Sequence, residues 1–146
     1  MLIALALSFS LAAPASAADP LDGLIGKKRV VLLFAKSRSD ASLDKQVARL
    51  AERRPEIEAN AMVVLRTAGD NETLPIIGYA TLPGGAARAL IRRFQPGPTG
   101  ITVVYVARDG QEKGRWTQVV DPQAIFDLAE SATVLQEENA AAGAVR

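Results

Sequence analysis

Three short apolar runs constrain the fold of this chain more than any other feature. They are Arg29 to Ala35 (RVVLLFA), Ala61 to Thr67 (AMVVLRT) and Ile101 to Ala107 (ITVVYVA). Runs of this length, rich in Val and Leu and without polar alternation, are typical of strands that are buried on both faces of a sheet. Segments with helical periodicity separate the runs, which predicts an α/β domain whose central sheet is covered by helices.

The intervening segments carry the usual marks of helix starts and ends. Ser39 or Asp40 can cap a first helix, Pro55 breaks it, and Asp121-Pro122 is a typical start for a third. The expected apolar faces are Leu43, Val47, Leu50 and Ala51 for the first helix, Ala87, Leu90, Ile91 and Phe94 for the second, and Ile125, Phe126, Leu128, Ala129 and Ala132 for the third.

Arg108-Asp109-Gly110 predicts a tight hairpin that leads into a polar edge strand at Glu112 to Thr117. Ala68 to Gly85 is predicted to be a long connection, with a short extended piece near Ile76 to Ala80. The expected order is therefore β-α-β-α-β-β-α, with a central four-stranded mixed sheet flanked by helices. Its two βαβ-type connections predict parallel pairing, and the tight turn predicts a final hairpin.

The first residues are typical of an export signal. Leu2 to Ala13 is apolar apart from two serines, and Ala15-Ser16-Ala17 matches a cleavage site, so residues 1–17 are predicted to be a signal peptide cut after Ala17. No Lys or Arg precedes Lys27, which leaves open an uncleaved anchor or a start codon recorded too far downstream. We expect a periplasmic or secreted protein with a lead-in at 18–28, a domain at 29–132 and a flexible tail at 133–146.

Composition excludes several kinds of chemistry. The net charge is +1, which does not indicate a nucleic-acid binder. The chain has no Cys and no His, so a structural zinc site and a serine hydrolase with the usual base are both implausible. The acidic cluster Asp70, Asn71 and Glu72 is too short for an EF-hand loop, and a solvated turn is favoured there. We predict no metal site and no cofactor.

The strand Arg29 to Ala35 with its polar turn, the segment Leu43 to Gln46, and above all Leu90 to Arg115 (LIRRF…GITVVYVARDGQEKGR) resemble a known family. It is a bacterial, usually exported domain of unknown function with a thioredoxin- and peroxiredoxin-like fold. The same domain type, called DUDES, is found in vertebrate sushi-repeat and coiled-coil matrix proteins. The resemblance covers roughly Leu21 to Ala132 and implies a thioredoxin-like α/β fold.

The redox site of such folds is missing from this chain. Thioredoxins place a CxxC motif where the first strand meets the first helix, and here Ser37-Arg38-Ser39-Asp40-Ala41 stands there. Ile101 aligns with the cis-proline that precedes a later strand, and we expect a trans peptide before it. Thiol–disulfide exchange and peroxide reduction both need a thiolate, so a chain without Cys can perform neither.

Two groups of residues remain as candidate binding sites. Ser37, Arg38, Ser39 and Asp40 lie at a predicted helix N-terminus, which can hold an anion, although helix capping is the favoured interpretation. Arg88 and Arg92 are neighbours at i, i+4 and could bind an acidic partner or a phospholipid head group, although a solvated polar face is the favoured interpretation. Trp116 on the edge strand could contact a partner or pack on the last helix.

These features favour an exported, redox-inactive binding or interaction module with an unknown protein partner. The alternative is an enzyme that uses Lys36, Arg38 and Asp40 around an anionic substrate at the helix N-terminus. That alternative lacks an acid–base pair of recognisable spacing, and no catalytic residue is predicted.

Overall fold

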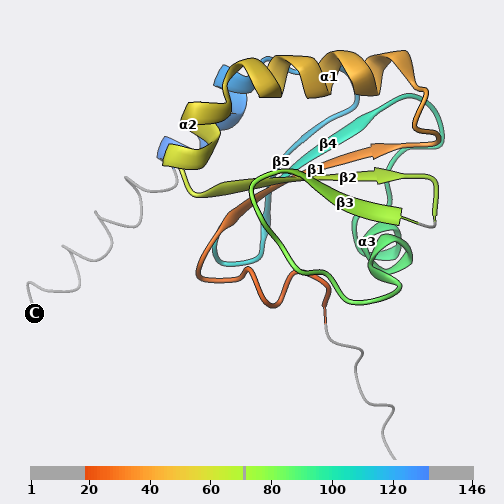
Figure 1. The fold of residues 1–146 in the computed structure, drawn as a ribbon, viewed down its shortest axis with the longest axis horizontal. Coiled ribbons are helices and arrows are strands. Elements are labelled where there is room, and N and C mark those ends of the chain that lie inside the picture. Colours follow the sequence, from red (N-terminus) through yellow and green to blue (C-terminus); the bar gives the residue numbers. More distant parts are fainter. Residues whose placement is uncertain (1–18, 71, 132–146) are drawn as a thin grey trace, which may run out of the picture.

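Helices cover both faces of a five-stranded mixed sheet in the computed structural model, which describes residues 19–70 and 72–131 (Figure 1). The sheet has the order β3-β2-β1-β4-β5. The strands are β1 (Arg29–Ala35), β2 (Met62–Ala68), β3 (Glu72–Ile77), β4 (Thr102–Val106) and β5 (Glu112–Trp116). The predicted export signal (1–17) and tail (133–146) lie outside the described residues.

The sheet differs from the expected one in strand number and in one direction. β1 and β2 pair in parallel, as predicted, but β4 runs antiparallel to β1. The cause is β3, a fifth strand that pairs antiparallel with β2 and reverses the chain before the next helix. β3 and β4 therefore point the same way, and the second helical crossover joins these two strands rather than β2 and β4.

The helices begin and end close to the expected places. They are α1 (Ala41–Glu52), α2 (Arg54–Ala59), α3 (Ala86–Phe94) and a last described helix at residues 122–131. Pro55 lies in the first turn of α2, where its missing N–H costs nothing, so α1 ends at Glu52 and a new helix starts. The Asp121 carboxylate accepts a hydrogen bond from the Gln123 N–H at 2.9 Å and caps the last helix.

The core consists of two clusters, one on each face of the sheet. α1, α2 and the last helix cover one face, and α3 with the segment before β1 covers the other (Figure 1). β1 contributes to both, because alternate side chains such as Leu32 and Leu33 point to opposite faces and both are fully buried. Leu21 and Leu24 from residues 19–28 belong to the α3-side cluster.

Two expectations about packing need correction or completion. Ala51 is exposed rather than part of the buried face of α1, and Gln46 is buried in its stead. Trp116 lies half-buried on β5, and its ring packs against the cluster that includes Leu128 of the last helix. The packing interpretation of Trp116 is therefore the one that the structure supports. No helix in the described part of the chain is long and apolar enough to span a membrane.

Candidate ligand cavity at the carboxyl edge of the sheet

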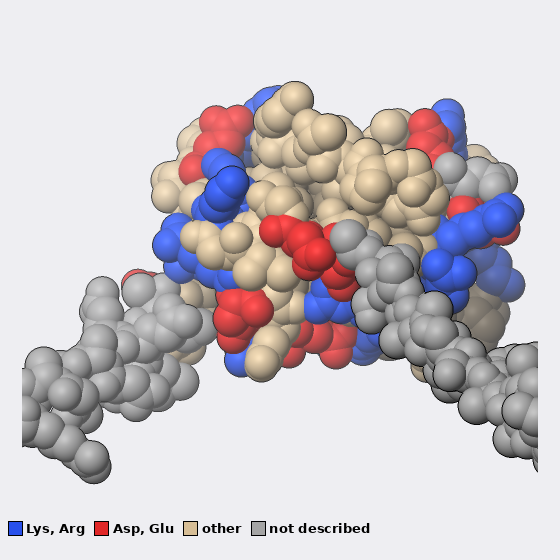
Figure 2. All heavy atoms as spheres, turned by 90° about the horizontal axis from the view of Figure 1, so that it is seen from below, with Lys and Arg blue, Asp and Glu red and all other residues tan. Residues whose placement is uncertain are grey.

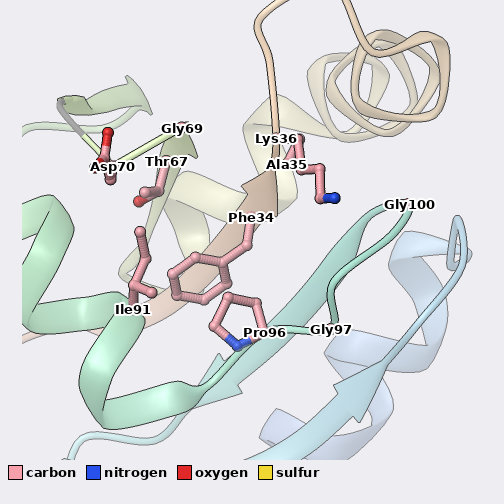
Figure 3. Close-up of a pocket in the computed structure, with 10 residues that line it drawn as sticks. All are labelled: Phe34, Ala35, Lys36, Thr67, Gly69, Asp70, Ile91, Pro96, Gly97 and Gly100. Atoms are coloured by element: carbon pink, nitrogen blue, oxygen red, sulfur yellow. The ribbon is translucent and has the colours of Figure 1, made fainter.

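A cavity of about 410 Å³ opens where β1 and β2 end, on the face of the sheet that α3 covers (Figure 3). Parallel strands end at the same edge, so the turns that follow β1 and β2 lie side by side there. β4 begins at this edge too, because Thr102 pairs with Phe34, and this brings in the loop before β4. The cavity is lined by Phe34, Ala35, Lys36, Thr67, Gly69, Asp70, Ile91, Pro96, Gly97 and Gly100.

The floor of the cavity is apolar. Phe34 at the end of β1 packs its ring against Phe94 of α3, with the ring centres 6.2 Å apart. Ile91 from the same helix and Pro96 from the following loop complete the floor, and Figure 3 shows their side chains gathered around the ring of Phe34. Ile91 was expected as a core residue of α3, but it is only partly buried, because one side of it faces the cavity.

The walls of the cavity are held by local hydrogen bonds. The Gly69 N–H donates to the Ala35 carbonyl at 2.9 Å, which ties together the turns after β1 and β2. Gly69 has a φ of +68°, a conformation that favours glycine. On the opposite wall the Gly97 N–H donates to the Thr102 hydroxyl at 3.2 Å. The loops that form the walls are therefore pinned to strand ends.

Two charged residues, Lys36 and Asp70, stand at the rim. Both side chains are exposed, and neither forms a hydrogen bond or ion pair with another residue of the described ranges. Figure 3 shows them on opposite sides of the apolar floor. The third polar residue, Thr67, is already engaged, because its hydroxyl shares a 2.8 Å hydrogen bond with that of Thr73 on β3.

The predicted anion site at Ser37 to Asp40 lies in the turn next to the cavity and does not line it. The Asp40 carboxylate accepts hydrogen bonds from the N–H groups of Ser42 and Leu43 at 2.9 and 3.1 Å, so it caps α1 as expected. Ser37 and Ser39 share a 3.2 Å hydrogen bond. Anion binding at this turn stays a prediction, and it would have to compete with the carboxylate that already holds these two N–H groups.

Arg38 from the same turn pairs with Glu72 at the start of β3. This ion pair joins the turn after β1 to the fifth strand, which the sequence pattern did not indicate. Because Arg38 is 64% exposed, the pair is worth little in stability. The pair engages Arg38 and Glu72 with each other, whereas Lys36 and Asp70 have no ion-pair partner in the described ranges.

Arg88 and Arg92 lie on the exposed face of α3 and not in the cavity. Neither guanidinium makes a hydrogen bond or an ion pair within the described part of the chain. Their neighbour Arg93 differs, because it pairs with Asp19 at 2.6 Å and stacks over Phe94. Figure 2 shows Lys, Arg, Asp and Glu interspersed on the face seen from below, with uncharged surface between them.

The sequence did not point to most of the cavity. Phe34, Thr67 and Pro96 look like ordinary strand and loop residues, and Asp70 was considered only for calcium. What could have found Phe34, Thr67 and Asp70 is their position at or just after the ends of two predicted parallel strands, where loops converge. Pro96 lies in the loop before β4, and no such signal marks it. The peptide before Ile101 is trans, as predicted, since the described residues contain no cis peptide.

Groups with a shifted pKa lie away from the cavity. Burial raises the pKa of the Tyr105 phenol, and the positive charge of Arg29 partly opposes this. On the surface, a hydrogen bond from Arg53 lowers the pKa of the Glu56 carboxyl. The described residues contain no group of three or more Asp or Glu side chains placed to hold a metal ion.

Comparison with known proteins places the fold. A family model described as "Domain of unknown function (DUF4174)" matches residues 20–138. A solved structure of the mitochondrial 2-Cys peroxiredoxin from Plasmodium falciparum superposes with a TM-score of 0.58 at 10% identity, over 80% of this chain and 82% of that one. The apo form of a protein called Trgpx gives a TM-score of 0.48 at 20% identity, over 75% and 85% of the two chains. No curated protein matches. The fold is thioredoxin-like.

Proposed function

This chain belongs to the DUF4174 family of domains of unknown function, and we propose that it is an exported, redox-inactive binding module that holds its ligand in the cavity beside Phe34. The observation that carries the proposal is the cavity itself, which combines an open apolar floor with two rim charges that have no partner in the described ranges. A pocket of this size with few polar groups is the usual form of a small-ligand site.

The residues present support redox inactivity. Thiol exchange needs a thiolate, and the chain has none. Among the described residues that line the cavity, the one side-chain hydroxyl belongs to Thr67, and it is hydrogen-bonded to the Thr73 hydroxyl rather than to a base. Nucleophilic catalysis needs a base within hydrogen-bond reach of the nucleophile. The geometry therefore favours binding over the alternative of an enzyme acting on an anionic substrate.

Export is supported by the sequence of residues 1–17, which lie outside the described part of the chain. The test is the mass of the protein recovered from the periplasm or the medium of an expressing bacterium. We expect a chain that begins at Ala18. Recovery of the full-length chain from the membrane fraction would instead support the uncleaved anchor, and recovery from the cytoplasm would overturn export.

The test of binding is a titration of isotope-labelled protein with indole, a neutral aromatic probe, followed by amide chemical shifts. We expect the largest shifts at Phe34, Ile91 and Gly97. Ile91→Trp should fill the cavity and abolish them. Ile76→Trp is the matched control, because Ile76 is also a half-buried isoleucine but packs in the cluster on the other face of the sheet.

Two results would overturn the proposed function. One is an absence of indole shifts at the cavity, or equal shifts in the wild type and Ile91→Trp. The other is disulfide reductase or peroxidase activity of the purified protein, freed of contaminating thiol proteins.

A further inference from the structure

The two rim charges have opposite signs, and this limits what the cavity can hold well. Lys36 follows β1 and Asp70 follows β2, so each stands at the end of one of two neighbouring parallel strands. They do not form an ion pair with each other, although Arg38 in the turn after β1 and Glu72 at the start of β3 do. Each rim charge is therefore free to meet a charge on a ligand.

Ligands with one charge would gain from one side of the rim and lose at the other. An anion is attracted by Lys36 and repelled by Asp70, and a cation meets the reverse arrangement. A ligand that carries both charges, with the ammonium toward Asp70 and the carboxylate toward Lys36, gains from both. Figure 3 shows the apolar floor of Phe34, Ile91 and Pro96 between the two charged residues.

On the basis of the proposed function, we propose that the cavity binds a small zwitterion whose two charges flank an apolar body, of the size and chemistry of an apolar dipeptide. The floor takes the apolar side chain, because burial against Phe34 and Ile91 removes it from water. Lys36 and Asp70 set the orientation of the ligand by its termini. A cavity of about 410 Å³ is large enough for a ligand of this size.

The experiment uses four probes that share one apolar body and differ only in charge. They are the dipeptide alanylphenylalanine, its N-acetyl form, its C-terminal amide, and the form with both caps. At about pH 7 they are a zwitterion, an anion, a cation and a neutral molecule. Affinities come from amide shift titrations of the whole protein. We expect the zwitterion to bind about tenfold tighter than the neutral form, since an exposed ion pair contributes about three-fold.

Neutralising variants assign each charge to its partner. Lys36→Gln should weaken only the probes with a free carboxylate, and Asp70→Asn only those with a free ammonium, by about three-fold each. Lys45→Gln and Asp44→Asn are the matched controls, because both residues are exposed on α1 and neither lines the cavity. They should change no affinity.

The outcomes separate this inference from the proposed function. If the neutral dipeptide binds as tightly as the zwitterion, or if either single-charge form binds tightest, the inference is wrong while the binding function stands. If indole binds and no dipeptide does, the same conclusion holds. If neither indole nor any dipeptide shifts the cavity amides, both proposals fail.

Discussion

At the scale of single residues, Gln46 is a polar side chain that connects α1 to the segment before the last helix. It is completely buried on α1, its amide nitrogen donates to the Val120 carbonyl at 3.0 Å, and its amide oxygen accepts from the Val120 N–H at 2.8 Å. These two bonds satisfy the backbone of a buried residue just before the last helix. The side chain thus joins α1 to the segment before the last helix, through a residue 74 positions away in sequence.

We predict that Gln46→Leu lowers the free energy of unfolding by about 2 to 4 kcal/mol, because it leaves both backbone groups of Val120 buried without a partner. Urea denaturation measures the loss. Lys45→Leu is the control, since the neighbouring residue is exposed and should change stability by less than about 0.5 kcal/mol. Equal stability of the two variants would show that Val120 finds other partners.

The sequence pattern could not single out Gln46, and the physical reason is general. Periodicity counts apolar residues, so it places Ala51 on the buried face of the helix and leaves Gln46 out of it. A buried amide becomes favourable only when its partner comes from a distant segment, here the loop at Val120. Asp40 was predictable as a cap, by contrast, because its partners Ser42 and Leu43 are neighbours in the chain.

Tyr105 makes the free energy of unfolding depend on pH in the alkaline range. Burial on β4 raises the pKa of its phenol above the ordinary value of 10.0. The folded state therefore holds the phenolic proton more tightly than the unfolded state. This contribution to stability is fully present below about pH 10 and is lost as the pH rises through the higher pKa of the folded protein.

The chain has two tyrosines, which makes the prediction simple to test. In Tyr79→Phe, Tyr105 is the one tyrosine left. As long as the protein stays folded, the ultraviolet absorbance change that marks ionisation of its phenol should occur above about pH 10. Tyr105→Phe should lose less stability than Tyr79→Phe between neutral and alkaline pH, because Tyr79 is 81% exposed. Equal losses in both variants would contradict the assignment.

At the scale of elements, the sheet and the last helix meet at Gly114. A Cβ at this position of β5 would lie 2.6 Å from Cδ1 of Leu128 and 2.8 Å from the Trp116 ring. Gly114→Ala should therefore destabilise the protein by about 1 to 3 kcal/mol, the usual cost of overpacking. Gly84→Ala is the control, because nothing lies within 4 Å of its Cβ. Thermal unfolding compares the two, and a neutral Gly114→Ala would mean that Leu128 turns away without cost.

Helices and strands were predictable where residues close in sequence mark them, such as an apolar run or a turn motif. β1 matches the expected range, and β5 and the hairpin before it follow from Asp109-Gly110, with Gly110 at a φ of +81°. β3 was missed as a full strand, because Pro75 and the flanking Gly69 and Gly78 are turn residues and its pairing partner is β2. A proline is compatible with an edge strand as well as with a loop, so the sequence around Pro75 could not distinguish the two. The direction of β4 depended on β3 and was wrong for the same reason.

At the scale of the whole molecule, positive and negative charges nearly balance and are dispersed. Electrostatic attraction of a partner therefore depends on local groups of charged residues rather than on the net charge of the protein. The net charge is +1, and Figure 2 shows both signs interspersed on one face. The exposed pair Arg88 and Arg92 is a local exception, because neither guanidinium has an acidic partner in the described ranges. A face of this kind is favourable for an acidic partner and adds nothing to the fold.

We predict that reversing both arginines, as Arg88→Glu with Arg92→Glu, changes the free energy of unfolding by less than about 0.5 kcal/mol, because no contact is lost. The same variant should lose any envelope protein that the wild type retains in crosslinked co-purification.

Lys45→Glu with Arg49→Glu on α1 is the matched control, with the same i, i+4 spacing and the same change of net charge. If both variants fail to retain the partner, binding depends on net charge alone, and α3 is excluded as a specific contact. A partner that neither variant loses would have to contact another surface. Since the cavity lies at the carboxyl edge of the sheet, indole binding should be the same in all three proteins, and this keeps a protein contact on α3 separable from a small ligand beside Phe34.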